Sequence, residues 1–235
     1  MAVVSIRWTS QLDDGVVLSP ERYDPRTRQS ASASAEDRTI AELANLSRET
    51  LQPQKAGAGL RYVVLDTGDA KNGIISLKAA DDHTGVGSAK KVLKSGDVII
   101  SRLRPYLRQA GLVDEALARL GIVTASTEFY VLRSKDGKSI AYLVAFLLSD
   151  KVQQILAASQ EGGHHPRVPE KTLTGLVVPA AIVGERDRLS RAVEDAALAT
   201  RRAEGLLADV GRLVADLLDP SAAHGPTVVD YDSGE

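Results

Sequence analysis

The chain of 235 residues contains no cysteine. This absence excludes disulfide bonds, thiolate metal sites and a cysteine nucleophile. The sequence also lacks an apolar run near the roughly 18 residues that a membrane-spanning helix needs, and no secretory signal opens it. We therefore expect a cytoplasmic protein that does not enter a membrane. Because the formal net charge is only −2, any basic surface that binds a polyanion must be local.

Sequence signatures of nucleotide-dependent enzymes are missing as well. No glycine-rich phosphate loop ends in Lys-Ser or Lys-Thr, and no dinucleotide fingerprint opens a helix. The run Tyr23-Asp-Pro-Arg26 has a single proline in the wrong order for the Asn/Asp-Pro-Pro-aromatic motif of amino-methyltransferases. We therefore predict a chain without catalytic residues of its own, without a bound cofactor and without a metal.

The composition is that of an ordinary globular protein, with 43% hydrophobic and 26% charged residues. Shifts in composition suggest four parts. Residues 1–36 form an N-terminal extension and linker, and residues 37–183 form a β-rich domain. Residues 184–219 form a long helix, and residues 220–235, with three acids and no Lys or Arg, form a disordered acidic tail. The predicted fold class is α+β, a β-rich domain followed by a long C-terminal coiled-coil helix.

Short apolar runs bounded by turn residues predict the strands of the domain, including residues 60–65, 98–101 and 128–132. Residues 41–46 are typical of a short helix. Residues 139–159 are apolar at helical spacing, which predicts one or two buried helices. A chain of this length can therefore form one large domain with an appendage.

A basic segment follows the strand-like run at residues 98–101. Between residues 55 and 108 there are ten Lys or Arg and five Asp or Glu. Guanidinium groups bind phosphates and base edges, and a tyrosine adds a flat amphipathic contact. The candidate DNA contacts in this segment are Lys90, Lys91, Lys94, Ser101, Arg102, Arg104, Tyr106 and Arg108. The alternative is an ordinary solvated charged edge.

A second candidate contact loop contains His164, His165 and Arg167, which follow two glycines. Glycine permits close approach of the backbone to a ligand, and imidazole and guanidinium groups can bond to phosphate or bases. A metal site is not favoured, because adjacent histidines rarely share one ion. An ordinary surface loop is the alternative.

The C-terminal part carries a heptad pattern that predicts a long helix over residues 185–218. Apolar or small residues recur at alternating spacings of four and three, as in the seam of a helix that packs lengthwise on another helix. The seam residues are Leu189, Val193, Ala196, Thr200, Ala203, Leu207, Val210, Val214 and Leu217. Packing on the helix within residues 142–158 of the same chain is the alternative, but that helix is too short to cover the whole seam. We predict a dimer or partner contact.

The order of these segments resembles a known family. The runs LKSGDVIISRLRP, ASTEFYVLR, YLVAFLLSDKVQQIL, GGHHPRVPEKTL and GLVVPAAIVGERDRL follow one another. This order is similar to one target-recognition domain and its spacer helix in the DNA-specificity subunits of type I restriction-modification systems. The resemblance covers about residues 37–218. At the entry to the long helix this chain has VPAAIVGERD, where the family often has a run like PLPPLEEQ.

The resemblance implies a role for each part. The β-rich target-recognition domain would read half of a bipartite sequence in double-stranded DNA, and the helix would set a distance and dock methyltransferase subunits, with a restriction subunit as a further partner. Full-length members carry two recognition domains and two helices, whereas this chain has one of each. It therefore resembles a half-subunit that would form a homodimer on a palindromic split target.

Two other functions fit parts of the sequence. A small metal-dependent nuclease would use Asp97, Glu128 and His164, although a turn-forming role is favoured for Asp97. A protein–protein adaptor of a phage-defence complex would keep the fold without reading a DNA sequence. Metal-dependent cleavage would indicate the nuclease, and indifference to loss of Arg102 and Arg104 would indicate the adaptor.

Overall fold

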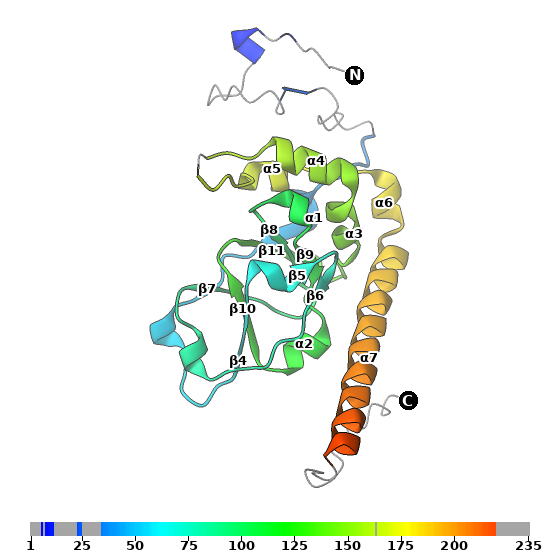
Figure 1. Cartoon of the computed structure of the whole chain (residues 1–235). Coiled ribbons are helices and arrows are strands. Elements are labelled where there is room, and N and C mark those ends of the chain that lie inside the picture. The colour runs from blue at the N-terminus through cyan, green and yellow to red at the C-terminus, as the bar shows by residue number, and fades with distance from the viewer. Residues whose placement is uncertain (1–5, 7, 12–22, 25–33, 163, 220–235) are drawn as a thin grey trace. The chain divides into compact units, whose positions relative to one another are not determined.

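The computed structural model describes residues 6, 8–11, 23–24, 34–162 and 164–219 (Figure 1). The predicted acidic tail and most of the predicted N-terminal extension lie outside these residues. Within the extension, Thr9–Gln11 forms a short 3-10 helix, η1. The chain divides into two compact units, Met1–Ala197 and Leu198–Glu235. The division falls inside the long C-terminal helix.

A four-stranded antiparallel sheet lies in the middle of the first unit. Its strands, in spatial order, are β2 (Ala44–Leu46), β11 (Phe129–Ser134), β8 (Val98–Ser101) and β9 (Ala110–Leu112). Every residue of β8 is buried, because both faces of this sheet are covered. Val98 and Ile100 face one core cluster, and Ile99 faces the other.

A second four-stranded sheet packs across one face of the first. Its strands are β3 (Thr50–Leu51), β7 (Lys90–Val92), β10 (Ile122–Ser126) and β4 (Tyr62–Leu65). Strands β10 and β4 are parallel, and the other pairs are antiparallel. Val63, Val123 and Leu117 of helix α2 (Glu115–Arg119) join Ile99 and Val131 of the first sheet in one apolar cluster. The two sheets therefore share this core.

Helices cover the opposite face of the first sheet (Figure 1). They are α1 (Ile40–Leu43), α3 (Tyr142–Leu148), α4 (Asp150–Ala158) and α5 (Glu170–Thr174). Leu143, Leu147 and Leu156 are buried there with Val98 and Ile100, so the predicted buried helices at residues 139–159 are confirmed. The predicted helix at residues 41–46 is wrong in its second half, because residues 44–46 pair with β11 as strand β2.

Two small sheets complete the unit. Strand β1 (Arg38–Thr39) pairs with β12 (Val177–Val178), and β5 (Ala70–Lys71) pairs with β6 (Ile74–Ile75). The remaining short elements are η3 (Pro53–Lys55), η4 (Thr67–Asp69), η5 (His83–Gly85), η6 (Pro105–Leu107) and α6 (Ala180–Gly184). Asp37 Oδ1 accepts a hydrogen bond of 2.8 Å from the Ala180 amide. This bond and the β1–β12 pair hold the beginning of the domain beside its end.

The predicted long helix is α7 (Arg186–Leu218), with 33 residues and a length of about 50 Å. Its first turns belong to the first unit: Leu189 and Val193 pack on the helical core, and Arg186 pairs with Asp136 at 2.6 Å. The fold is thus α+β, a β-rich domain followed by a long C-terminal helix, as predicted. Among the described residues, no helix combines the length and apolar character that crossing a membrane requires.

Candidate nucleic-acid interface

The topology brings charged residues together where the two sheets meet. Residues 127–128 carry the chain from the end of β10 in one sheet to the start of β11 in the other. At this junction Ser126 lies opposite Lys90 of β7, and Phe129 lies opposite Ser101 of β8. The start of β7, the end of β8 and the β10–β11 connection are therefore neighbours. We call the charged residues gathered here the junction cluster: Lys90, Lys91, Arg102, Glu128 and Arg167.

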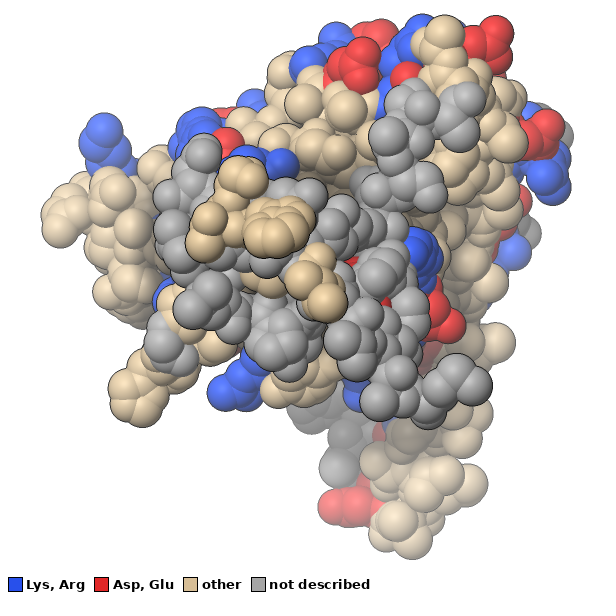
Figure 2. Space-filling model, turned by 90° about the horizontal axis from the view of Figure 1, so that it is seen from above, with Lys and Arg blue, Asp and Glu red and all other residues tan. Residues whose placement is uncertain are grey.

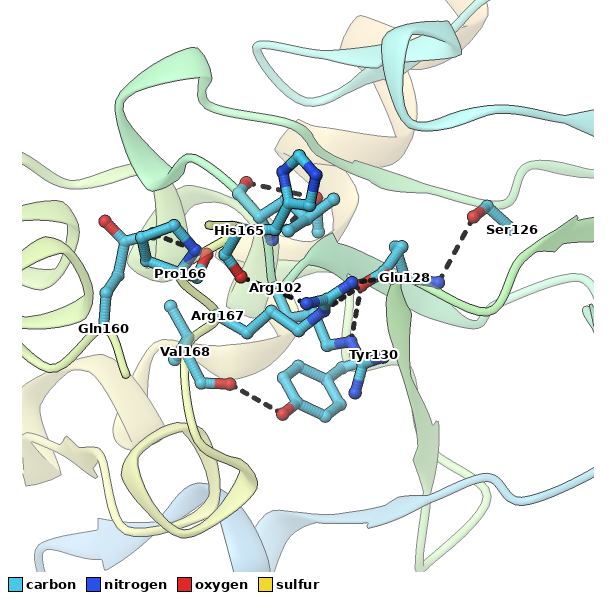
Figure 3. A network of polar contacts seen from close by, with 11 residues as sticks. Arg102, Ser126, Glu128, Tyr130, Gln160, His165, Pro166, Arg167 and Val168 are labelled. Carbon is cyan, nitrogen blue, oxygen red and sulfur yellow. Dashed lines mark hydrogen bonds and ion pairs between the residues drawn. The ribbon is translucent and has the colours of Figure 1, made fainter. Parts of the chain in front are cut away.

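Glu128 is the centre of the junction cluster (Figure 3). Its Oε2 accepts hydrogen bonds from Arg102 Nε at 2.7 Å and from Arg167 Nε at 3.0 Å, and its Oε1 accepts one from Arg167 Nη2 at 2.7 Å. The backbone strengthens this arrangement, because the Arg102 amide donates to the Glu128 carbonyl at 3.0 Å and the Val168 amide donates to the Arg102 carbonyl at 2.8 Å. One carboxylate thus joins the segment after β8 to the loop before α5.

The predicted histidine loop is closed by backbone bonds between Glu161 and Arg167, of 2.9 and 2.8 Å. Arg167 Nη1 also donates to the His165 carbonyl at 3.1 Å. The rings of His164 and His165 stack at a centroid distance of 5.8 Å, and both residues are exposed. A β-bridge pairs Leu103 with Arg167. The structure therefore brings together the two candidate contact segments, which lie about sixty residues apart in the sequence.

The Arg167 guanidinium, followed by that of Arg102, lowers the pKa of the Glu128 carboxyl from 4.5 to about 2, against the opposing effect of burial. The side chain of Glu128 is 20% exposed, so solvent screens these interactions only in part. Nearby, burial raises the pKa of Tyr130, whose hydroxyl donates to the Val168 carbonyl at 2.7 Å. With a pKa of about 2, the Glu128 carboxylate is ionised throughout the neutral pH range.

This shift predicts an acid-dependent contribution to stability. A folded-state pKa below the unfolded value means that Glu128 stabilises the fold above pH 4.5 and loses this contribution as the pH falls toward 2. At neutral pH we expect Glu128→Gln to melt at a lower temperature than the wild type. The difference between the two melting temperatures should shrink over this acidic range, as measured by circular dichroism. A difference independent of pH would contradict an ionised Glu128 in the network.

Positive charge exceeds negative charge around the junction cluster. Lys91 is half-buried, and its pKa is lowered by burial and by repulsion from Arg48 and Arg102. Arg48 pairs with Glu170 at 2.5 Å. Arg48 was not predicted from the sequence, because nothing in its local pattern distinguishes it from any other surface arginine. Its position near Lys91 results from the β3–β7 pairing that follows it.

The turn η6 presents exposed residues beside the cluster. Arg104 and Tyr106 are exposed, the latter by 69%. Arg104 and Arg108 flank the turn with φ of 46° and 51°, a left-handed conformation that costs energy for residues other than glycine. Arg108 offsets this cost, because it donates to the Leu148 carbonyl at 2.6 Å and pairs with Asp150. Arg108 therefore anchors the turn to α3 and α4, and Arg104 and Tyr106 are left at the surface.

Two predicted contacts are placed differently from the rest. Ser101 is buried, and its hydroxyl accepts a bond of 3.1 Å from the Leu103 amide, so it supports the turn from inside. Lys94 lies before the opposite end of β8 and pairs with Glu49 at 3.1 Å. Neither residue belongs to the junction cluster. Ser101 is buried and does not reach the surface, and Lys94 precedes the start of β8, whereas the cluster lies at the end of β8.

The predicted nuclease residues do not form a metal centre. Asp97 is 1% exposed, and its two oxygens accept bonds of 2.8 Å from Nε and Nη2 of Arg133. Asp97 Oδ2 also accepts a bond from the Lys94 amide at 2.8 Å, which fits the turn-forming interpretation. In the described part of the chain, no three His, Asp or Glu side chains are grouped closely enough to hold a metal ion. Asp97 and Glu128 are instead each bound to arginines.

Acidic side chains interrupt the basic surface. On the face seen in Figure 2, where grey atoms do not cover it, Lys and Arg side chains lie beside Asp and Glu side chains. This agrees with the net charge of −2 and with the carboxylate at the centre of the junction cluster. Attraction to a polyanion is therefore local.

The second candidate surface is the apolar stripe on α7. Of the predicted seam, Leu189 and Val193 pack on the domain core, Thr200 is half-buried, and Ala196 and Ala203 are exposed. The remaining seam residues are exposed, as are Leu206 and Leu213, two of the four exposed α7 leucines outside the four-three pattern. We call these exposed residues the α7 stripe: Leu206, Leu207, Val210, Leu213, Val214 and Leu217. Because Leu206 and Leu213 also repeat at seven, the stripe is wider than a two-position seam.

No protein-family model matches the sequence, and no curated protein is significantly similar to it. Solved structures do match the fold. One comes from work on the assembly and conformational transition of a type I R-M system, with 24% identity, a TM-score of 0.54, and coverage of 81% of this chain and 51% of that chain. Another is the HsdS subunit from Thermoanaerobacter tengcongensis, with 22% identity, a TM-score of 0.54, and coverage of 86% and 54%. This chain therefore matches about half the length of each solved chain, and its fold is that of a type I restriction-modification specificity subunit, as the sequence resemblance predicted.

Proposed function

We propose that the protein is a non-catalytic DNA sequence-recognition subunit of a restriction-modification or related phage-defence system in the cytoplasm. The proposal rests on the junction cluster, which lies in a domain with the fold of a specificity subunit. Lys91, Arg102 and Arg167 come from three separate segments, and Arg48 adds a fourth cation nearby. Cations that repel one another at a surface gain stability when they bind phosphates.

The recognition surface would extend from the junction cluster to the turn and the loop on either side of it. Arg104 and Tyr106 lie on one side and His164 and His165 on the other, joined through the Leu103–Arg167 bridge. Phosphate contacts would fix the position of the domain on double-stranded DNA, and base contacts would select the sequence. One such domain would read one half of a bipartite target.

The α7 stripe would bind a second copy of the chain. Leu207 and Leu217 are 73% and 80% exposed, and contiguous apolar surface of this kind marks an interaction site. The matched part of this chain covers about half of each solved chain, so two matched parts would span about one such chain. A two-fold pair would place two reading domains on a palindromic split target, and the paired helices would dock methyltransferase and restriction subunits.

Selection from a random duplex library tests the proposal, with the full chain alone and together with a type I methyltransferase subunit. We expect an enriched split motif with a fixed gap, and a two-fold symmetric motif if the protein acts as a dimer. Salt-sensitive binding without enrichment would leave only a generic basic surface. The absence of binding in both settings would contradict DNA recognition and favour the adaptor.

A further inference from the structure

The two arginines bound to Glu128 differ in how much of each guanidinium is occupied. Arg167 uses Nε and Nη2 for the two carboxylate oxygens and Nη1 for the His165 carbonyl. Arg102 contacts the carboxylate through Nε. Glu128 therefore does not occupy Nη1 and Nη2 of Arg102. The Arg102 side chain is 33% exposed, and it also interacts with the Tyr130 hydroxyl.

The unequal pairing fixes the orientation of Arg102. A free arginine samples many rotamers, and ordering such a side chain at an interface costs about 0.5–1.5 kcal/mol. The Nε–Glu128 bond and the backbone bonds on both sides of Arg102 impose this order before any ligand binds. The terminal edge of a guanidinium carries two coplanar donors, which match the O6 and N7 acceptors of guanine in the major groove.

We propose that Arg102 reads a guanine edge and that Glu128 is a positioning residue, which holds Arg102 ready and uses Arg167 to lock the histidine loop beside it. This inference rests on the proposed function, because it names the residues that would make recognition sequence-specific. Arg104, which is exposed just before η6, would contact phosphate instead. Different arginines of the recognition surface would thus select the sequence and supply general attraction to DNA.

Binding measurements on two duplexes test the inference. One duplex carries the motif that the wild type selects, and the other carries a scrambled sequence of the same length. We expect Glu128→Gln to reduce the ratio of the two affinities by about tenfold or more, the usual range for losing one bidentate base contact. Affinity for the scrambled duplex should stay equal or rise, because one negative charge is removed. A merely structural role would weaken binding to both duplexes alike.

Two further variants make the test specific. Arg102→Lys keeps the positive charge but loses the planar pair of donors, so it should reduce the affinity ratio as much as Glu128→Gln does. Glu170→Gln is the matched control: it removes the same charge nearby, but its partner is Arg48. The control should keep the wild-type affinity ratio.

The outcomes of these measurements distinguish failure of the inference from failure of the proposed function. If the wild type selects a motif and both Glu128→Gln and Arg102→Lys retain its affinity ratio, the inference is wrong and the proposed function stands. If the wild type selects no motif, the proposed function fails and the inference with it. Circular dichroism reports whether Glu128→Gln folds, and if it does not, Arg102→Lys alone decides.

Discussion

Replacing Leu207 and Val214 by glutamate is expected to convert the proposed dimer into a monomer. Both side chains lie on the α7 stripe and are exposed in the single chain, by 73% and 49%. Burying a Leu or Val side chain contributes about 1.5–3 kcal/mol, and a two-fold interface loses each contact twice. The dimer dissociation constant should therefore rise by at least about a hundredfold, at about 1.4 kcal/mol per factor of ten. Analytical ultracentrifugation over a concentration series measures this change.

A matched variant tests whether loss of the dimer results from the changed stripe or from damage to the helix as a whole. Ala208 and Ala215 are each one residue further along α7, which turns them about 100° around the axis and away from the stripe. Ala208→Glu with Ala215→Glu adds the same charges to the same turns and should leave the dimer intact. Equal loss of dimer in both variants would point to a damaged helix, and a wild type that is monomeric at all concentrations would contradict the two-fold arrangement.

Replacing Asp97 by asparagine is expected to lower the free energy of unfolding by about 3–5 kcal/mol, the usual cost of removing one partner from a buried ion pair. Asp97 is 1% exposed, binds Arg133 through both oxygens and accepts the Lys94 amide bond. The Asp97 carboxylate, followed by that of Glu49, raises the pKa of Arg133 above its usual range. The variant would therefore leave a permanent positive charge without its main partner. Urea denaturation measures the loss.

A surface pair provides the control for Asp97. Glu115 pairs with Arg119 at 3.3 Å, and their side chains are 70% and 77% exposed. Exposed pairs contribute about 0–1 kcal/mol, so Glu115→Gln should change the unfolding free energy little. The nuclease alternative makes a different prediction: divalent-metal-dependent cleavage by the wild type that Asp97→Asn abolishes without a comparable loss of stability. Such a result would overturn the structural role of Asp97.

Local sequence patterns were sufficient to predict several helices and strands. The run at residues 98–101 is β8, and the helical spacing at residues 139–159 gives α3 and α4. The second half of the predicted helix at residues 41–46 became β2 instead. In that short segment, pairing with β11 outweighs weak helical propensity, which is a common result of tertiary context.

The candidate site was predictable in type but not in detail. The sequence singled out Arg102, Arg167 and the histidines by residue chemistry. Only the nuclease alternative gave Glu128 a role, at a metal site, whereas the structure places it between two arginines. Arg108 was grouped with the DNA contacts, and the structure uses it to anchor η6. The partners of a charged side chain depend on strand register and crossovers, and one-dimensional spacing contains neither.

The sequence by itself determined the α+β class, the long C-terminal helix and the apolar repeat along it, because hydrophobic periodicity is a local property that dictates which face of an element must be buried. The tertiary structure decided which of these residues remain at the surface. Leu189 and Val193 of the repeat are covered by the domain core, whereas Leu207 and Val214 are exposed. It also decided that Glu128 joins two distant arginines, because the connection between the sheets brings the ends of β8 and β10 together.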